Sequence, residues 1–341
     1  MSDLRFGLVG LGHWGPNYVR LLSGIVPGAR LVACAELREE RRHPMARLHP
    51  GVRFHSDHCG LLAAGGLDAV IVATSAVSHL PVVEDCVNAG LPVLVEKPLA
   101  HTVDAAEAMV RAAEEARCTL MVGHTFLFNP AVDRIKLAID QGELGRPLYF
   151  AFRRTGLGPI RQDVNALWDL APHDLSMLRH WLGTDPVEVT ARGQSYLRDD
   201  VEDVVFLTLR YPGGVLAGIQ VSWLDPVKDR RVTIVGDRRM VVYDDVHPTE
   251  KLRVYDKGAS YQPRGGEFSE FLAAVRDGDI LIPKLENSEP LREELAHFVE
   301  CVRTGARPRS DGRDGLAIVR ILERAQADLA RPSTSAAAAA V

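Results

Sequence analysis

The sequence has few lysines, no long apolar run and no excess of positive charge, and each shortage argues against a class of protein. Lysine supplies 6 of the 40 basic residues and the net charge is −5, so no basic surface indicates nucleic-acid binding. No apolar run approaches the roughly 20 residues that cross a bilayer, so we expect no membrane span. Strand-like sequence begins so close to Met1 that we also expect no signal peptide.

The cysteines are few and lack the paired spacing of a metal site. None forms a CxxC motif, and three lie in or beside apolar segments, so we interpret them as reduced core residues of a cytoplasmic protein and not as metal ligands. The five are Cys34, Cys59, Cys86, Cys118 and Cys301. Hydrophobic content of 46% and charged content of 25% are ordinary for a globular protein. A length of 341 residues suggests two domains.

A glycine motif near the N-terminus predicts a dinucleotide site. Gly10, Gly12 and Gly15 follow the strand-like run 4–9 and precede a helix-like segment, 18–22. The first glycine permits a tight turn, the second lets a pyrophosphate approach the backbone, and the third lets helix and strand pack closely. The N-terminus of the helix then offers free N–H groups to the phosphates. His13 and Trp14 lie inside this loop, and we expect both beside the cofactor.

The choice of dinucleotide depends on the end of the next strand. The run 29–35 is followed by Glu36, which can accept hydrogen bonds from both ribose hydroxyls of NAD and would repel a 2′-phosphate. Arg38, Arg41 and Arg42 follow, and an arginine can accommodate that phosphate, although these residues also fit a solvated helix face. The sequence favours NAD and leaves NADP possible.

Glu96-Lys97-Pro98 follows the apolar run 91–95 and places a lysine at the end of a buried strand. Partial burial lowers the pKa of a lysine and makes its ammonium useful to a reacting hydroxyl. The proline fixes the backbone directly after Lys97.

Strands and helices alternate through the first third of the chain, which predicts a doubly wound parallel sheet. Ligands bind at the carboxyl ends of such strands. Thr74, Glu96, Lys97 and His124 fall there. The expected strands after residue 36 are 67–74, 93–95 and 119–123, and the expected helices are 80–89, 103–117 and 131–141.

The pattern changes after about residue 145 to short, alternating, β-rich runs separated by Gly, Pro and Asp turns. These predict an open, mostly antiparallel sheet with one inserted helix, 172–182, and two later helices, 291–304 and 315–329. The expected strands are 147–155, 187–194, 204–211, 215–222, 230–235 and 240–243. The run 268–276 fits either a helix or a strand, and we expect the Ser/Ala tail 331–341 to be disordered.

The inserted helix carries the second set of chemical groups. Asp169 and His173 are four residues apart, which places both on one face if the helix begins before Asp169. Because Pro172 fits best in a first turn, Asp169 is alternatively the N-cap. Either geometry lets a carboxylate orient an imidazole that acts as a general base. His173 would then remove a hydroxyl proton, while Lys97 holds the substrate oxygen.

Together these motifs resemble the glucose-fructose oxidoreductase/inositol dehydrogenase (Gfo/Idh/MocA) family in order and spacing, from about residue 4 to about residue 330. The motifs are Gly10-x-Gly12-x-x-Gly15, Thr74 with His79, Glu96-Lys97-Pro98 and Asp169-x3-His173. The resemblance implies an α/β fold with an N-terminal Rossmann domain, residues 1–124, and a C-terminal α/β domain, residues 125–330. It also implies a homo-oligomer, a dimer or tetramer, built through the open C-terminal sheet.

The same resemblance implies roles for single residues. Lys97, Asp169 and His173 occupy the catalytic positions, His79 and Glu96 lie beside the cofactor, and a cis bond is plausible before Pro98. The chain departs from the family three residues after the histidine. The family often has an acid there and this chain has Ser176, while Asp174 directly follows His173.

Four residues are candidates for contact with the substrate, because their segments face the expected cleft. They are His124, Arg153, Arg154 and Asn165. Adjacent strand residues point to opposite faces, so at most one of the two arginines should reach the substrate.

The leading interpretation is an NAD(P)-dependent dehydrogenase that oxidises a secondary hydroxyl of a small-molecule sugar, nucleotide-sugar or cyclitol. One alternative is a ketosugar reductase that uses NADPH. Another is a dinucleotide-binding regulator without activity, which would have no need of the Lys97, Asp169 and His173 set.

Overall fold

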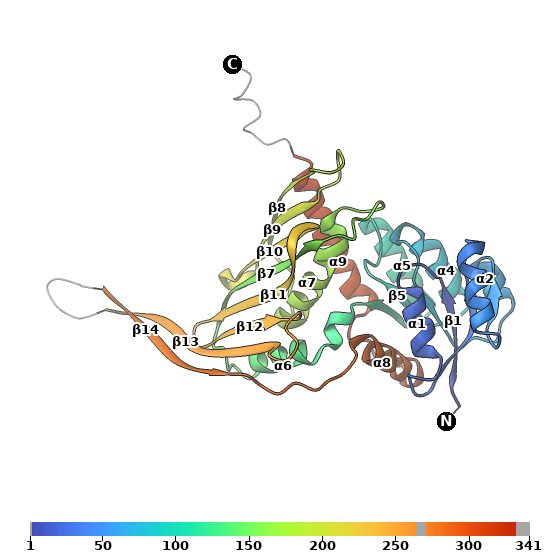
Figure 1. Cartoon of the computed structure of the whole chain (residues 1–341), viewed down its shortest axis with the longest axis horizontal. Helices are drawn as coiled ribbons and strands as arrows, with labels where there is room; N and C mark the ends of the chain where they lie inside the picture. Colours follow the sequence, from blue (N-terminus) through green and yellow to red (C-terminus); the bar gives the residue numbers. More distant parts are fainter. Residues whose placement is uncertain (1, 264–270, 332–341) are drawn as a thin grey trace, which may run out of the picture. The chain divides into compact units, whose positions relative to one another are not determined.

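A computed structural model describes residues 2–263 and 271–331, and these form two compact units (Figure 1). The first unit joins residues 1–129 to residues 288–320, and the second joins residues 130–287 to residues 321–341. The predicted boundary was a single one after residue 124, with residues 288–320 in the second domain. No helix among the described residues is long and apolar enough to cross a membrane.

The described residues of the first unit form a sheet of six parallel strands in the order β3-β2-β1-β4-β5-β6. The bounds are β1 Leu4–Val9, β2 Ala29–Ala35, β3 Arg53–His55, β4 Ala69–Val72, β5 Val93–Glu96 and β6 Leu120–Gly123. Every residue of β4, β5 and β6 is buried, as expected for apolar strands covered on both faces. The strand order reverses between β1 and β4, where such sheets bind ligands at their carboxyl edge.

Within the described ranges, seven α-helices belong wholly or partly to this unit (Figure 1). They are α1 Gly15–Leu22, α2 Glu39–Leu48, α3 His58–Ala63, α4 His79–Asn88, α5 Val103–Glu115, α8 Pro290–Thr304 and α9 Gly312–Leu329, the last of which contributes to both units. Local chemistry fixes two of the starts: Asp57 accepts a hydrogen bond from the Gly60 amide, and Thr102 from the Ala105 amide. The strand β3 and helix α3 were not predicted, because a three-residue strand and a six-residue helix show little periodicity.

Residues 288–320 join the first unit through apolar and backbone contacts. The ring of Phe298 on α8 packs edge-on against Phe6 of β1, with centroids 6.0 Å apart. Ser310 accepts a backbone hydrogen bond from Val122 at 2.8 Å, and its hydroxyl donates to the Val122 carbonyl at 2.7 Å. These contacts join segments that lie 188 residues apart or further along the chain, so local sequence pattern does not reveal them.

The described part of the second unit contains an eight-stranded sheet in the order β14-β13-β12-β11-β7-β10-β9-β8. Its neighbours are antiparallel except β7 and β10, which run parallel. The bounds are β7 Pro147–Leu157, β8 Glu188–Gln194, β9 Val204–Arg210, β10 Leu216–Ser222, β11 Leu224–Gly236, β12 Met240–Asp244, β13 Leu252–Pro263 and β14 Phe271–Leu281. The undecided run 268–276 is therefore strand from residue 271, and its first residues lie outside the described part of the chain, as does the tail from residue 332.

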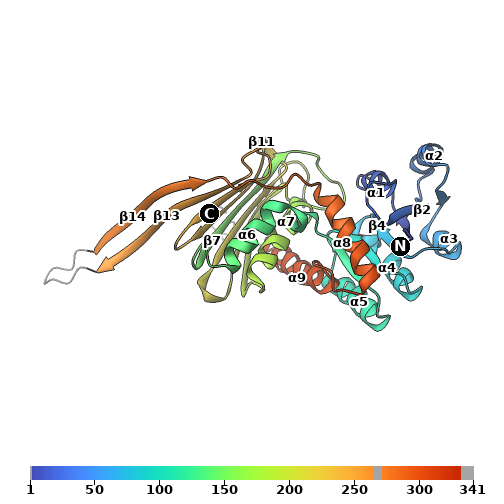
Figure 2. The ribbon, with the colours of Figure 1, turned by 90° about the horizontal axis from the view of Figure 1, so that it is seen from below.

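Helices α6 Pro130–Asp140 and α7 Ala166–Leu182 cover one face of this sheet (Figure 2). Trp181 of α7 stacks on Phe150 and Phe152 of β7, each with ring centroids 6.1 Å apart. The alternation of β7 thus buries Phe150 and Phe152 beneath α7 and turns Tyr149 to the opposite face, where it is exposed.

Helix α7 begins six residues earlier than the predicted start at Pro172. Asn165 is its N-cap, with a side-chain oxygen that accepts from the Trp168 amide at 3.1 Å. The alternative in which Asp169 caps the helix is therefore wrong, and Asp169 lies in the first turn. Pro172 misled the prediction because it lies inside the helix, where proline is uncommon.

Candidate active site

The glycine loop has almost no room for side chains at two of its three glycines. Gly10 has φ +99°, and a Cβ there would lie 2.7 Å from the Ala73 carbonyl oxygen. A Cβ on Gly15 would lie 2.4 Å from the Gly10 carbonyl oxygen. Gly12 differs, because the atom nearest to an added Cβ would be an Arg41 nitrogen at 3.6 Å, which is an ordinary contact distance. The first and third glycines are therefore required by the loop itself, whereas the second leaves open space on which a pyrophosphate can lie.

Glu36 lies at the end of β2 against this loop and is buried. One carboxylate oxygen accepts from the Leu11 amide at 2.7 Å, and the other accepts from the Arg38 amide at 2.9 Å. Arg42 donates to the Glu36 backbone carbonyl and not to its carboxylate. The carboxylate is thus held by backbone donors where a ribose of the cofactor would lie. His13 and Trp14 are exposed on the same loop.

Thr74 and His79 join the carboxyl end of β4 to the segment after β5. The buried imidazole of His79 has its Nδ1 3.0 Å from the Leu99 carbonyl and its Nε2 3.3 Å from the Thr74 carbonyl. Burial lowers the pKa of His79, so the ring is neutral at physiological pH. In the described structure, His79 therefore bridges two backbone segments at the edge where the glycine loop lies.

Glu96 and Lys97 lie at the carboxyl end of β5, and the Lys97–Pro98 peptide is cis, which confirms that expectation. Glu96 is buried, and its carboxylate accepts from the Tyr18 hydroxyl at 2.8 Å and from the Lys97 amide at 3.2 Å. Tyr18 belongs to α1, the helix that follows the glycine loop. Glu96 thus connects α1 to the backbone of Lys97. Lys97 itself is half-buried.

His124 follows β6, the strand next to β5, and its side chain is buried. Burial lowers the pKa of His124 to about 3, with the nearby Lys97 charge acting in the same direction. Neither ring nitrogen has a hydrogen-bond partner among the described residues. A neutral, buried imidazole therefore lies near Lys97.

Asp169 and His173 lie in the second unit, one turn apart on α7, and both are half-buried. The Asp169 carboxylate accepts from the indole nitrogen of Trp223 at 3.2 Å. Arg161 lies at the edge of hydrogen-bonding distance, 3.5 Å from the other oxygen. Most residues next to this pair in the sequence are buried, so Asp169 and His173 share the accessible face of the helix.

The two adjacent arginines of β7 point to opposite faces of the sheet, as predicted. Arg154 is buried and donates through Nε and Nη2 to the buried Asp174 of α7, at 2.7–3.1 Å. Arg153 is exposed and pairs with Asp225 at 3.1 Å. Asp174 thus joins α7 to β7 through a buried ion pair.

Removing Arg154 should destabilise the second unit strongly. Arg154→Met leaves the Asp174 carboxylate buried without its ion partner, and we expect a loss of about 3–5 kcal/mol in the free energy of unfolding. Arg153→Met is the matched control on the exposed face, with an expected change below about 1 kcal/mol. Urea unfolding of both variants makes the comparison. Equal losses in the two variants would contradict a stabilising role of the buried pair.

Asn165, predicted to bind substrate, is engaged as the cap of α7. Its amide nitrogen donates to Glu202 at 2.6 Å and to Gln326 at 2.8 Å, and its oxygen accepts from Trp168. Both polar atoms of the side chain therefore have protein partners.

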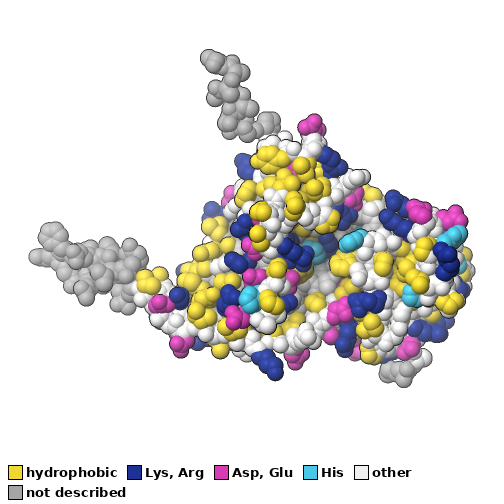
Figure 3. Space-filling model, in the orientation of Figure 1, with side chains coloured by type: hydrophobic (Ala, Val, Ile, Leu, Met, Phe, Trp, Pro, Cys, Tyr) yellow, Lys and Arg dark blue, Asp and Glu magenta, His cyan; other side chains and the backbone are white. Residues whose placement is uncertain are grey.

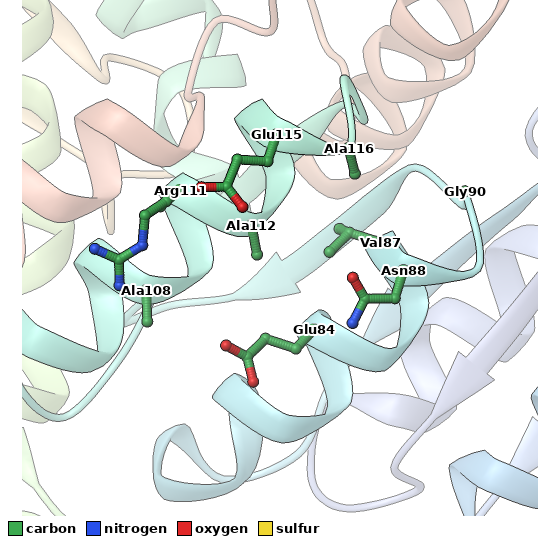
Figure 4. Close-up of a pocket in the computed structure, with 9 residues that line it drawn as sticks. All are labelled: Glu84, Val87, Asn88, Gly90, Ala108, Arg111, Ala112, Glu115 and Ala116. Carbon is green, nitrogen blue, oxygen red and sulfur yellow. The ribbon is translucent and has the colours of Figure 1, made fainter.

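A surface groove between α4 and α5 holds none of the predicted site residues (Figure 4). It extends to Asn88 and Gly90 at the end of α4, from which the chain enters the amino end of β5. It is therefore at the opposite edge of the sheet from Lys97. Its lining residues are Glu84, Val87, Asn88, Gly90, Ala108, Arg111, Ala112, Glu115 and Ala116.

The predicted residues thus fall into two groups, one in each unit. Tyr18, which contacts Glu96, and Glu294, which lies near it, were not predicted. Tyr18 has a weak sequence signal, a polar aromatic residue on the inner face of the helix that follows the glycine loop. Glu294 has none, since a glutamate near a helix start is usually solvated.

Comparisons with known proteins agree with this architecture. A family model described as an oxidoreductase family with an NAD-binding Rossmann fold matches residues 4–124, and a GFO/IDH/MocA C-terminal domain matches residues 132–242. Inositol 2-dehydrogenase 2 of Saccharopolyspora erythraea is 29% identical over 97% of this chain and 95% of its own. Inositol 2-dehydrogenase of Rubrobacter xylanophilus is 31% identical over 70% of each chain.

Solved structures give the same result. UDP-N-acetylglucosamine 3-dehydrogenase of Acidithiobacillus ferrooxidans superimposes with a TM-score of 0.80, at 25% identity, over 96% of this chain and all of its own. The glycine loop, the buried acid at the end of β2 and the family matches together identify the cofactor as NAD. The chain therefore belongs to the Gfo/Idh/MocA family of NAD-binding oxidoreductases.

Proposed function

We propose that this protein oxidises a secondary hydroxyl of a sugar, nucleotide-sugar or cyclitol and passes the hydride to NAD. The observation that carries the proposal is that Lys97, which follows the carboxyl end of β5, lies near the buried, neutral imidazole of His124, which follows the neighbouring strand β6. Relatives named inositol 2-dehydrogenase and UDP-N-acetylglucosamine 3-dehydrogenase support this class of substrate.

The residues of the first unit fit the cofactor. The backbone around Gly12 is open, which would let a pyrophosphate approach, and backbone donors hold Glu36 in an orientation that would suit the ribose hydroxyls. NAD, when bound, supplies the hydride acceptor. Side chains of the protein would hold the hydroxyl oxygen and take up its proton.

Lys97 would hold the oxygen of the reacting hydroxyl. An ammonium close to that oxygen stabilises negative charge as the proton leaves, and partial burial strengthens the interaction. His124 would contribute a neutral hydrogen-bonding edge beside it.

His173 would be the general base. Its position one turn from Asp169 lets the carboxylate stabilise the imidazolium formed when the proton is taken up. Trp223 donates to the Asp169 carboxylate and so restricts its orientation.

Among the four residues predicted to bind substrate, the geometry supports only His124. Arg154 and Asn165 hydrogen-bond protein partners through their polar groups, and Arg153 lies on the opposite face of the sheet from α7. We therefore propose structural roles for Arg154 and Asn165, in place of substrate contact.

Turnover with a panel of cyclitols, aldoses and nucleotide sugars tests the proposal. The wild-type protein should form NADH with at least one compound that has a free secondary hydroxyl, and none with the matching deoxy compound. Formation of NADP from NADPH and a ketosugar, without the forward reaction, would favour the reductase alternative. Binding of NADH without turnover of any compound would favour the regulator.

We also propose that two or more copies associate through the open face of the eight-stranded sheet. The exposed residues on that face are Tyr149 on β7, Phe206 on β9 and Leu216 on β10. Leu216 and Tyr149 are partners in neighbouring strands and so lie side by side. Hydrophobic side chains are visible over the second unit in Figure 3. Sedimentation should give a dimer or tetramer, and Phe206→Asp should shift it toward the monomer. A monomeric wild type at micromolar concentration would contradict this proposal.

A further inference from the structure

A buried carboxyl group on α8 lies beneath the carboxyl ends of β5 and β6. Glu294 is completely buried, and one of its oxygens accepts from the Thr125 hydroxyl at 3.1 Å. Glu96 is its acidic neighbour, and Tyr18 of α1 lies within electrostatic range of both. The groups that face Glu294 are therefore Glu96 from β5, Thr125 from the turn after β6, and Tyr18 from α1. Figure 2 shows α8 and α1 in the first unit.

The hydrogen-bond donors are divided unequally between the two acids. The Glu96 carboxylate accepts from the Tyr18 hydroxyl and from the Lys97 amide. Within the described part of the chain, Glu294 accepts from Thr125 alone, and its other oxygen has no hydrogen-bond partner. A buried carboxylate needs several donors, and two adjacent buried carboxylates cannot both ionise cheaply. The donor count therefore makes Glu96 the ionised acid and Glu294 the neutral one.

The electrostatics of the cluster agree with this division. Burial, together with the charge of Glu96, holds the pKa of Glu294 well above its usual range. Burial and the two acids hold the pKa of Tyr18 well above its usual range, so its hydroxyl stays protonated and continues to donate. The cluster thus holds one negative charge, on the acid that accepts from the Lys97 amide.

Glu294 and Glu96 each accept a hydrogen bond from a residue that is in the proposed site or next to it. Thr125 directly follows His124, so its bond to Glu294 fixes the turn that carries the imidazole. Glu96 pairs with Gly123 across β5 and β6, and a Cβ on Gly123 would lie 3.5 Å from a Glu96 carboxylate oxygen. Glu96 in turn holds the Lys97 amide.

We propose that Glu294 is a positioning residue for the dehydrogenase reaction, acting as a neutral acid through Thr125 and Glu96 to place His124 and Lys97. The inference rests on the proposed function for its effect on turnover. The protonation state of Glu294 can be tested without any substrate, because it changes how the stability of the protein depends on pH.

The pH dependence of stability follows from the sign of the shift. In the unfolded chain Glu294 loses its proton near its ordinary pKa of 4.5, whereas in the folded protein it keeps the proton to higher pH. Above that value the unfolded state therefore binds fewer protons, and this residue makes the folded state less stable as the pH rises. The folding equilibrium constant should fall by up to about tenfold per pH unit for this reason.

Glu294→Gln keeps the shape of the neutral acid and removes its titration. Relative to this variant, the wild type should lose stability progressively between about pH 5 and pH 8, as measured by urea unfolding at each pH. Glu293→Gln, at the neighbouring position of α8 that is not fully buried, is the matched control and should follow the wild type. A constant difference between wild type and Glu294→Gln over this range would overturn the assignment of a neutral acid.

Turnover and NADH binding test the positioning role. Glu294→Gln should retain kcat within about threefold, whereas Glu294→Ala should lower it by about tenfold to a hundredfold because Lys97 and His124 lose their support. Thr125→Val removes the hydroxyl that donates to Glu294 while keeping the size of the side chain, and it should also lower kcat. This second variant tests the role if Glu294→Ala does not fold. Loss of activity in Glu294→Gln equal to that in the alanine variant would contradict the proposal, as would wild-type kcat in Thr125→Val. If no substrate is oxidised by the wild type, the proposed function fails, while the pH series still decides the state of Glu294.

Discussion

His173→Ala should lower kcat for polyol oxidation by about a hundredfold to ten-thousandfold while leaving the affinity for NADH unchanged. A positioned general base contributes a factor of this size, and the histidine lies on α7, in the unit that lacks the glycine loop. Stopped-flow measurement of NADH formation at saturating substrate gives the loss in kcat, and fluorescence titration gives the affinity. Asp169→Asn should reduce kcat in the same direction by a smaller factor, since it acts through the imidazole.

His180→Ala is the matched control for this experiment, because that histidine lies in the last turn of the same helix. It should keep kcat within about threefold of the wild type. Lys97→Met should lower kcat and raise KM together, since the ammonium is assigned to hold the hydroxyl before and during the reaction. Retention of wild-type kcat in His173→Ala would show that another group removes the proton.

Gly12→Ala and Gly15→Ala should separate cofactor binding from folding of the glycine loop. The Gly15 Cβ would meet the Gly10 carbonyl oxygen at 2.4 Å, so the loop must shift, and we expect a loss of about 1–3 kcal/mol in stability with at least about tenfold weaker NADH binding. The Gly12 Cβ would meet only an Arg41 nitrogen at 3.6 Å in the free protein. Gly12→Ala should therefore unfold within about 0.5 kcal/mol of the wild type and still bind NADH at least about tenfold more weakly.

Gly51→Ala provides the control, because no described residue places an atom within 4 Å of its added Cβ. It should change neither stability nor NADH affinity beyond the precision of the measurement. Unchanged NADH affinity in Gly12→Ala would show that the pyrophosphate does not approach this backbone. Equal destabilisation by Gly12→Ala and Gly15→Ala would contradict the described geometry of the loop.

The sequence predicted the parallel sheet of the first unit well because its evidence is local. Apolar runs such as 93–95, bounded by turns, alternate with helical segments, and the carboxyl ends of these runs then fall on one edge. Thr74, Glu96 and His124 could therefore be placed on that edge by sequence pattern alone. The opposite directions of Arg153 and Arg154 followed from the period of a strand.

Features that depend on distant segments were not predictable in this way. No local pattern shows that α8 returns to β1, that Glu294 lies beside Glu96, or that Arg154 meets Asp174. The cap at Asn165 was different, because an asparagine before an apolar periodic segment is a known start signal. The start of α7 was predicted at Pro172, where a proline fits a first turn, and was therefore placed six residues too late.

Transfer of deuterium to the nicotinamide tests the central claim most directly. A cyclitol or sugar that the protein oxidises is labelled with deuterium at the carbinol carbon, incubated with NAD, and the cofactor is analysed by mass spectrometry. We expect one deuterium in each reduced nicotinamide and one ketone formed for each, with the label lost from the substrate carbon. Reduced cofactor without deuterium, or no reduced cofactor with any member of the panel, would contradict it.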